Sequence, residues 1–220
     1  MKTVKQSVQL VWATPDPLKI IERVGRICYK SEDKITENSS EKFVKMLIDR
    51  GHEAMIEHVS ASFLIVTNKG ISHEIVRHRI ASFAQESTRY VNYNKDKFDK
   101  QITVIEPDFS EAKNEYENQA EAAKFDWTHA VCEAEHVYLK LIEQGISPQH
   151  ARSVLPQCLK TEIVMTANAR EWRHFLTLRL HKSAHPQIRE LAQMIKTELY
   201  EWGTVLFEDF QGGLRSTIGS

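Results

Sequence analysis

Two segments of this chain share one plan, in which an alternating run that is typical of a strand leads directly into a helix. Residues 59–67 place Val59, Ala61, Phe63 and Ile65 on one face and Ser60, Ser62, Leu64 and Val66 on the other, and they are rich in β-branched residues, which predicts a strand. Ser72 can cap the helix that follows. Residues 162–167 predict a second strand, and Asn168 with Glu171 forms a capping box that opens the next helix. This mixture of strands and helices predicts an α/β or α+β protein.

Further predicted elements extend the same mixture. A strand is predicted at 7–13, and helices are predicted at 17–28, 40–50, 110–144 and 186–207. The helix over 110–144 has a seam of small residues, so we expect it to pack either against helices of its own chain or against another subunit. A chain of 220 residues without a Pro-, Gly- or Ser-rich linker fits a single domain over residues 1–220, with a mixed sheet flanked by long helices.

A cationic triplet is predicted at the C-terminal end of the helix that Ser72 opens. After Arg77, His78 and Arg79, seven residues separate the triplet from Ser87. Guanidinium groups bind phosphate oxygens bidentately, and hydroxyl and amide groups can hydrogen-bond to the edge of a polar heterocycle. Cations at a helix end are also common on a solvated surface, where they meet the negative pole of the helix dipole. The spacing to Ser87 favours the first interpretation, which is a nucleotide site.

The charge balance of the chain bears on the class of its ligand. The formal net charge is −1 and the isoelectric point is about 6.8, whereas dedicated nucleic-acid-binding domains usually carry a basic excess. A non-enzymatic binder is the alternative, in which the clusters at Arg77 and Arg89 bind RNA or DNA phosphates while Tyr90 and Tyr93 stack on bases. The net charge favours small-molecule partners and argues against a nucleic-acid partner.

Cysteine use and hydropathy indicate the cellular setting. Cys28, Cys132 and Cys158 are widely spaced, and no apolar stretch at the N-terminus resembles a signal peptide, which predicts a reducing cytoplasm. The longest apolar runs are far shorter than the roughly 20 residues that a membrane-spanning helix needs. We therefore expect a soluble protein with no membrane partner.

Two segments, beginning at His52 and His73, start like the helix of a zinc protease. The second histidine, which the metal requires one turn later, is replaced by Ile56 in the first segment and by Arg77 in the second. His58 would lie on the wrong face of a helix that carries His52. We therefore expect no metal site.

Arg179 continues an apolar stripe. Trp172, Phe175, Leu176 and Arg179 recur at helical spacing, which extends this arginine toward a place where water is scarce. Because a buried cation must be paired, Arg179 is expected to have either a carboxylate partner or an anionic ligand. Ser87, by contrast, has no evident base to activate it as a nucleophile, so we interpret it as a binding residue.

The chain resembles the flavin-dependent thymidylate synthases in the spacing of Arg77-His78-Arg79, Ser87 and Arg89-Tyr90. The resemblance spans roughly residues 50 to 190 and includes further segments in the same order: Gly51-His52-Glu53, Glu57-His58 and the segments 151–156, 168–170 and 175–179. It implies the fold of that family and a homotetramer in which each site is shared between subunits.

The resemblance also implies the reaction. NADPH would reduce FAD, methylenetetrahydrofolate would supply a one-carbon unit to C5 of the uracil ring of dUMP, and the reduced flavin would complete the methyl group of dTMP. The protein would supply position and electrostatics while the cofactor carries the redox step. No cysteine would need to attack the ring.

Residue roles are implied by the same resemblance. Arg179 would be catalytic, because the matching arginine lies over the uracil carbonyl and ring N3 and favours an ionised ring. The cofactor would be bound by Ala54, Arg77, His78, Arg79, Gln85, Asn168, Ala169, Arg170 and His174. The nucleotide would be bound by Glu74, Arg77, Gln85, Glu86, Ser87, Thr88, Arg89, Arg152 and Arg179. Three of these positions depart from the common family pattern, where glutamate is frequent at Gln85, a hydroxyl residue at Ala54 and asparagine at His174.

Overall fold

The computed structural model describes residues 1–110 and 119–210, and the chain divides into two compact units. Unit 1 comprises residues 1–6, 66–74 and 85–163. Unit 2 comprises residues 7–65, residues 75–84 and the chain from residue 164 onward. Helices and strands are mixed along the chain, which confirms the predicted α/β class. A single domain over residues 1–220 stays a prediction.

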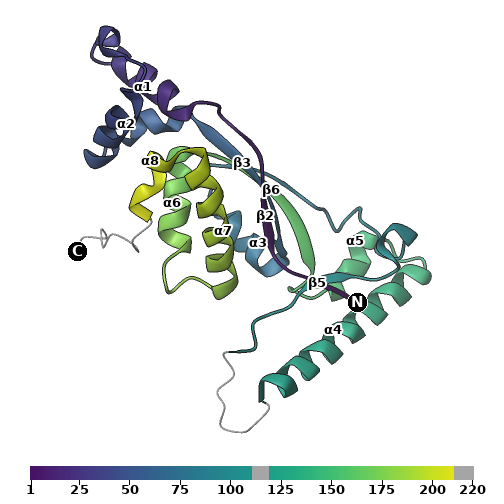
Figure 1. The fold of residues 1–220 in the computed structure, drawn as a ribbon. Helices are drawn as coiled ribbons and strands as arrows, with labels where there is room; N and C mark the ends of the chain where they lie inside the picture. Colours follow the sequence, from purple (N-terminus) through teal and green to yellow (C-terminus); the bar gives the residue numbers. More distant parts are fainter. Residues whose placement is uncertain (111–118, 211–220) are drawn as a thin grey trace. The chain divides into compact units, whose positions relative to one another are not determined.

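The strands form two sheets (Figure 1). The four-stranded sheet has the order β2-β3-β6-β4, and β1 pairs in parallel with β5, with Lys2 opposite Thr103. The bounds of the strands are β1 Lys2–Val4, β2 Ser7–Ala13, β3 Ser60–Asn68, β4 Ser82–Gln85, β5 Thr103–Ile105 and β6 Lys160–Asn168. The strands predicted at 7–13, 59–67 and 162–167 are therefore confirmed as β2, β3 and β6.

The helices differ widely in length. Their bounds are α1 Pro17–Ile27, α2 Ser40–Asp49, α3 Lys69–Ile75, α4 Gln119–Glu143, α5 Pro148–Ala151, α6 Ala169–Arg179, α7 Pro186–Trp202 and α8 Thr204–Phe207. Short 3₁₀ turns include η2 Glu53–His58, η4 Arg152–Val154 and η5 Glu208–Phe210. Among the helices within residues 1–110 and 119–210, none combines the length and apolar composition that crossing a bilayer requires.

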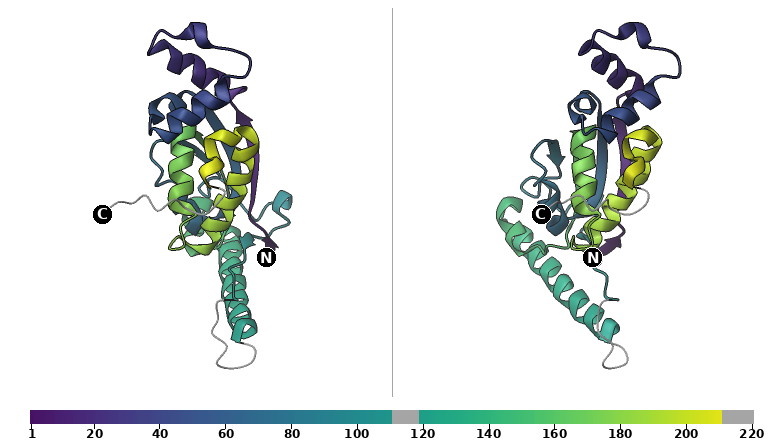
Figure 2. Two further views of the ribbon diagram at one scale, coloured as in Figure 1. Left: turned by 60° about the vertical axis from the view of Figure 1, so that its left-hand side comes forward. Right: turned by 90° about the vertical axis from the view of Figure 1, so that its left-hand side faces the viewer.

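The core of unit 2 lies beneath α6 and α7, which run side by side in both figures (Figures 1 and 2). Trp172 of α6 is fully buried, and its ring meets the ring of Phe63 edge-on with 5.0 Å between centroids. Its indole N–H donates to the carbonyl of Ala61 at 3.1 Å, so this large aromatic group is buried without an unsatisfied polar atom. The apolar face of α7 is fully buried as well, through Ile188, Leu191, Ala192, Ile195 and Leu199.

Helix α4 carries the core of unit 1. Its Tyr138 is fully buried together with Ile102, Val104 and the nearly buried Leu159. Glu135, on the same helix, accepts hydrogen bonds from the N-terminal amino group of Met1 and from the backbone N–H of Ile102, each at 2.8 Å. These contacts fix α4 against the small β1–β5 sheet within its own unit.

Helices α3 and α6, each of which directly follows a strand, begin in the same way. The side-chain oxygen of Asn68 accepts from the N–H of Ile71 at 2.8 Å, and that of Asn168 accepts from the N–H of Glu171 at 2.9 Å. The capping residue predicted at Asn168 is therefore confirmed. Ser72 was the wrong choice for the other helix, because its hydroxyl lies inside α3 and donates back to the carbonyl of Lys69.

Three predicted helices have different bounds in the structure. Because α3 begins at Lys69 and ends at Ile75, the cationic triplet follows the helix instead of belonging to its last turn. The long helix predicted from residue 110 is described from Gln119, and residues 111–118 lie outside the described residues. The last predicted helix is divided into α7 and α8 at Gly203, where an added Cβ would approach Leu206 to 3.0 Å.

Candidate functional site

Unit 2 contains a cleft of about 710 Å³ that is rich in charged side chains. Its walls come from η2, from the segment after α3, from the first turns of α6 and from η5. Six of the predicted cofactor-binding residues line it: Arg77, His78, Arg79, Asn168, Arg170 and His174. The fold therefore brings together two stretches of sequence that lie roughly ninety residues apart.

Arg77 and Arg79 are exposed side chains on the wall of this cleft. Within residues 1–110 and 119–210, neither arginine has a hydrogen bond or an ion pair. Helix α3 has already ended at Ile75, and the chain turns after it, with the N–H of His78 donating to the carbonyl of Ile75 at 3.2 Å. Two exposed and unpaired forks of this kind suit an anionic ligand such as a phosphate group.

Arg170 is held by two carboxylates of η2. Its Nη1 donates to Glu57 Oε1 at 2.5 Å, and its Nε lies 3.3 Å from Glu53 Oε2. The hydrogen bond to Glu57 raises the pKa of Arg170, although this arginine is already charged at any ordinary pH. An anion that approached Arg170 would therefore have to replace these carboxylates.

Arg173 fixes the C-terminal wall of the cleft. Its Nη1 and Nη2 donate to the carboxylate of Asp209 at 2.8 and 2.6 Å, and its guanidinium lies 5.2 Å from the ring centre of Phe210. Its Nε is buried and has no hydrogen-bond partner among the described residues. The sequence pattern did not single out Arg173 or Phe210, because each becomes part of the site only through contacts between distant segments. Glu53 and Glu57, by contrast, belong to segments that the family resemblance already included.

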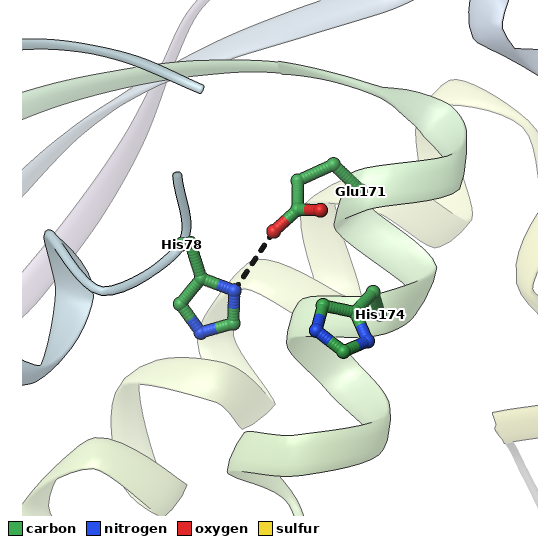
Figure 3. Close-up of side chains that lie close together, drawn as sticks. All are labelled: His78, Glu171 and His174. Carbon is green, nitrogen blue, oxygen red and sulfur yellow. Dashed lines mark hydrogen bonds and ion pairs between the residues drawn. The ribbon is translucent and has the colours of Figure 1, made fainter. Parts of the chain in front are cut away.

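His78, Glu171 and His174 lie close together and all line the cleft (Figure 3). His78 reaches from the segment after α3, and its Nδ1 lies 2.9 Å from Glu171 Oε1, while His174 stands one turn further along α6. Arg179 donates from Nε to His78 Nε2 at 3.0 Å. Arg179 is thus linked to a carboxylate through an imidazole, a partner that the two expected alternatives, a direct carboxylate or an anionic ligand, did not include.

The ligand atoms of His78, Glu171 and His174 lie within 4.8 Å of one another, a spacing that could hold a metal ion. Both nitrogens of His78 are already engaged, because one is bonded to Glu171 and the other accepts from Arg179. The four arginines that line the cleft, Arg77, Arg79, Arg170 and Arg173, would also repel a cation. The residues present therefore fit an anion better than a metal, and the expected absence of a metal stays a prediction.

The surroundings of His78 disfavour its protonated form. Burial is the largest influence and lowers the pKa of His78; the hydrogen bond to Glu171 opposes it, and the charge of Arg179 lowers the pKa further. His174 acts in the same direction as Arg179, and the pKa of His78 is lowered from its ordinary value of 6.5. His78 is therefore neutral in the folded protein near pH 7.

Stability should decrease in acid because of this histidine. Above about pH 6.5, His78 is neutral in both the folded and the unfolded chain, so it adds no pH dependence. Below that value the unfolded chain binds a proton that the folded chain does not, so the free energy of unfolding falls until the pH reaches the lower folded pKa. Urea unfolding of wild type and His78→Gln between pH 7.5 and 5 measures this slope. Equal slopes would contradict a lowered pKa.

Two other predicted cofactor-binding residues, Ala54 and Ala169, do not line the cleft. Ala54 is an exposed residue of η2, but it does not line the cleft. Ala169 is fully buried, and its backbone N–H donates to the carbonyl of Val59 at 2.9 Å. The resemblance implied that Ala169 binds the cofactor, but its backbone N–H is already bonded within the protein.

Unit 1 contains a second cleft, of about 470 Å³. Two residues of the predicted nucleotide set line it, and Arg152 Nη1 donates to Thr88 Oγ1 at 3.1 Å. Lys69 and His73 line the same cleft and add basic character that the sequence pattern did not identify. Burial lowers the pKa of Lys69, whose Nζ donates to the backbone carbonyl of Glu86 at 3.1 Å.

The segment before Ser87 is anchored by hydrogen bonds within unit 1. Gln85 Nε2 donates to Ser72 Oγ at 2.9 Å and to Thr161 Oγ1 at 3.1 Å, and a glutamate at this position could not make these donations. Glu86 accepts from the hydroxyl of Tyr93 at 2.9 Å and pairs with Lys160 at 3.3 Å. Both side chains therefore support the segment, and neither lines the cleft.

Ser87, Arg89 and Glu74 complete the predicted nucleotide set. Ser87 Oγ accepts from the backbone N–H of Arg89 at 3.4 Å, and the guanidinium of Arg89 lies 5.4 Å from the ring centre of the exposed Tyr90. Glu74 lies near the end of α3. Their roles toward a nucleotide stay predictions.

Known proteins match almost the whole chain. A family model described as "Thymidylate synthase complementing protein" matches residues 9–203, a range that includes most residues of both clefts. A flavin-dependent thymidylate synthase from Pyrococcus furiosus is 33% identical, and the match covers 87% of this chain and 78% of that protein. One from Geobacter sulfurreducens is 31% identical, with 84% and 78% covered.

A solved structure is also similar. It is a UMP/dUMP methylase from Streptomyces cacaoi bound with 5-Br dUMP, and it superposes with a TM-score of 0.80 at 26% sequence identity. The superposition covers 96% of each chain, so both clefted units have counterparts in that structure.

Proposed function

Because this chain belongs to the flavin-dependent thymidylate synthase family, we propose that it converts dUMP to dTMP by reductive methylation with a bound flavin. We propose FAD as the flavin, NADPH as the reductant and methylenetetrahydrofolate as the one-carbon donor. When bound, the reduced flavin supplies the hydride that completes the methyl group. The observation that carries this proposal is the cationic cleft of unit 2, in a chain that matches this family over residues 9–203.

The cleft of unit 2 fits the cofactor by its chemistry. Arg77 and Arg79 offer exposed guanidinium forks, whereas the buried Nε of Arg173 lies 3.8 Å from Glu53 Oε1. A dinucleotide carries a pyrophosphate and several polar ring atoms that could satisfy such donors. We propose that Arg77, His78, Arg79, Asn168, Arg170 and His174 hold the flavin, with Ala54, Gln85 and Ala169 contributing at most through their backbone or by support.

The nucleotide is proposed to bind the segment from Gln85 to Arg89. Ser87, Thr88 and Arg89 would bind the nucleotide directly, with Glu86 supporting the segment and Glu74 and Arg77 contributing from the end of α3. Arg152 would neutralise the phosphate, and its present bond to Thr88 holds it within the unit 1 cleft. Arg179 would act on the uracil ring, where its positive charge favours the ionised form and so makes C5 nucleophilic.

We also propose a homotetramer in the cytoplasm. Cys28, Cys132 and Cys158 are all unpaired, which is common in reducing compartments. The shared-site arrangement of the family motivates the tetramer, in which Arg152 and Arg179 of one site come from different subunits.

In the alternative, a nucleic-acid binder, only one of the two proposed stacking residues is available to a base. Tyr93 is only 5% exposed and its hydroxyl is bonded to Glu86, so its ring cannot stack on a base. Tyr90 is 77% exposed and remains able to do so. The enzyme hypothesis is tested by the visible absorption spectrum of the purified protein and by an assay of dTMP formation from dUMP. A colourless protein that binds no added FAD would contradict it.

Arg79→Ala should weaken FAD binding by about tenfold or more, because a methyl group cannot replace a charge-assisted bidentate bond to phosphate. The dissociation constant can be measured by titrating the apoprotein with FAD and following flavin fluorescence. The matched control is Arg23→Ala, an exposed arginine of α1 outside the cleft, which should bind FAD like wild type. Equal FAD affinity of the Arg79 and Arg23 variants would exclude Arg79 from the cofactor site.

A further inference from the structure

Three side chains of unit 2 form a continuous hydrogen-bonded chain from a carboxylate to a guanidinium. Glu171 Oε1 lies 2.9 Å from His78 Nδ1, and His78 Nε2 accepts from Arg179 Nε at 3.0 Å. Glu171 and Arg179 are the third and the last residues of the same helix, α6, while His78 comes from a distant segment. We propose that Glu171 and His78 are positioning residues that set the orientation of the Arg179 guanidinium.

The chemistry of these three hydrogen-bonded side chains allows only one arrangement of protons. An arginine Nε carries a hydrogen and can only donate, so His78 Nε2 must be the acceptor. The ring hydrogen of the neutral imidazole then sits on Nδ1 and points at Glu171, whose ionised carboxylate can only accept. Each group fixes the proton position of the next, so a change at Glu171 is transmitted to Arg179.

Burial and ring contacts hold the imidazole in this orientation. His78 is 3% exposed and Glu171 is 6% exposed, so water does not compete for their hydrogen bond. The ring of His78 lies 4.8 Å from that of Phe175 and 5.8 Å from that of His174, which restricts its rotation. A guanidinium that bonds through Nε to a fixed imidazole is held in one plane before the ligand binds. A flexible arginine would instead lose conformational entropy when the ligand binds, which would weaken the binding.

The first turn of α6 fixes the position of Glu171. Glu171 lies in the first turn of α6, where the positive end of the helix dipole stabilises a carboxylate. Its backbone N–H is capped by Asn168, which fixes the position of the residue from which the side chain extends. The cap that the sequence predicted at Asn168 therefore has a second consequence, because it also anchors the residue whose carboxylate meets His78.

This inference rests on the proposed function only in the role of Arg179 toward dUMP. Its structural part concerns the tautomer of His78, which can be measured without dUMP. The proposed function can fail while the tautomer is as stated, and the tautomer can be wrong while the enzyme makes dTMP. The two outcomes are therefore distinguishable.

The tautomer is measured by nitrogen-15 NMR of the imidazole in the full-length holoprotein. His78 should show a protonated Nδ1 and an unprotonated Nε2 at pH 7, and the double variant Glu171→Ala/Arg179→Ala, which removes both partners of the imidazole, should convert it to a mixture of tautomers. Glu171→Gln, whose amide oxygen can still accept from Nδ1, should retain the wild-type tautomer. A wild-type His78 that is protonated on Nε2 would overturn the proposal.

A double-mutant cycle on dUMP affinity tests the effect on Arg179. Glu171→Ala should weaken dUMP binding by about tenfold when Arg179 is present, because a guanidinium that is no longer oriented loses its contact with the ligand. The same substitution should have almost no effect in the Arg179→Ala background. Glu171→Gln should recover most of the affinity. The control Glu201→Ala, an exposed residue of α7, should bind dUMP normally. Equal losses from Glu171→Ala in both backgrounds would assign Glu171 a general structural role and overturn the proposal.

Discussion

Arg179→Lys should lower the rate of dTMP formation by about 100-fold or more, because it removes an oriented donor that acts on developing negative charge. Lysine keeps the positive charge but lacks the planar fork. It also lacks Nε, so the bond to His78 Nε2 at 3.0 Å is lost and the hydrogen-bonded chain that begins at Glu171 ends at the imidazole. The rate should be measured under saturating dUMP, so that a change in kcat is separated from a change in KM.

Arg189→Lys is the matched control for this prediction. Arg189 lies on α7 and donates to the backbone carbonyl of Lys182 at 3.4 Å, outside both clefts. Its replacement by lysine should leave the rate of dTMP formation unchanged. If Arg179→Lys retained a rate close to that of wild type, a positive charge alone would suffice at this position and the ring-orienting role would be wrong.

Mixing Arg152→Ala and Arg179→Ala subunits should restore activity that neither variant has alone. In the proposed tetramer, each site takes Arg179 from one subunit and Arg152 from another. In a random mixture each arginine is intact with a chance of one half, so about a quarter of the sites are complete by the symmetry of the assembly. The two inactive variants are unfolded and refolded together, and dTMP formation is then assayed.

Two controls are needed for the mixing experiment. Wild type refolded by the same procedure should regain its activity, and each variant refolded alone should remain inactive. Arg152 lies in unit 1 and Arg179 lies in unit 2, so each variant alters one unit and leaves the other intact. If the mixture stays as inactive as the single variants while wild type recovers, the site is not shared in the proposed way.

The two segments in which a strand leads into a helix show which parts of this fold a local sequence pattern could predict. Alternation and β-branched residues located β3 and β6 within two residues at either end, because these signals are local. The start of α3 was wrong, because Asn68 and Ser72 are both good capping residues and the sequence does not say which one has a helical N–H within reach. That choice depends on where β3 ends.

The candidate site was predictable in its residue types and unpredictable in its pairings. The cationic triplet and the opening of α6 line one cleft, as the motifs indicated. The partners of these residues were not visible in the motifs, since Glu171 lies 93 positions from His78 and Asp209 lies 36 positions from Arg173. The helical stripe that carries Arg179 predicted burial and a partner, but it could not show that the partner is an imidazole.

The sequence by itself determined the class of fold, the positions of the main strands, the capping of α6 and the family of the chain, because each depends on neighbouring residues or on fixed spacing. Only the tertiary structure decided which arginines are unpaired, which carboxylates hold Arg170 and Arg173, and which partners face the two nitrogens of His78. Such pairings require that segments distant in sequence be buried together. Burial removes water as a competing partner, so each donor must find its acceptor within the protein, and the fold alone determines which acceptor that is.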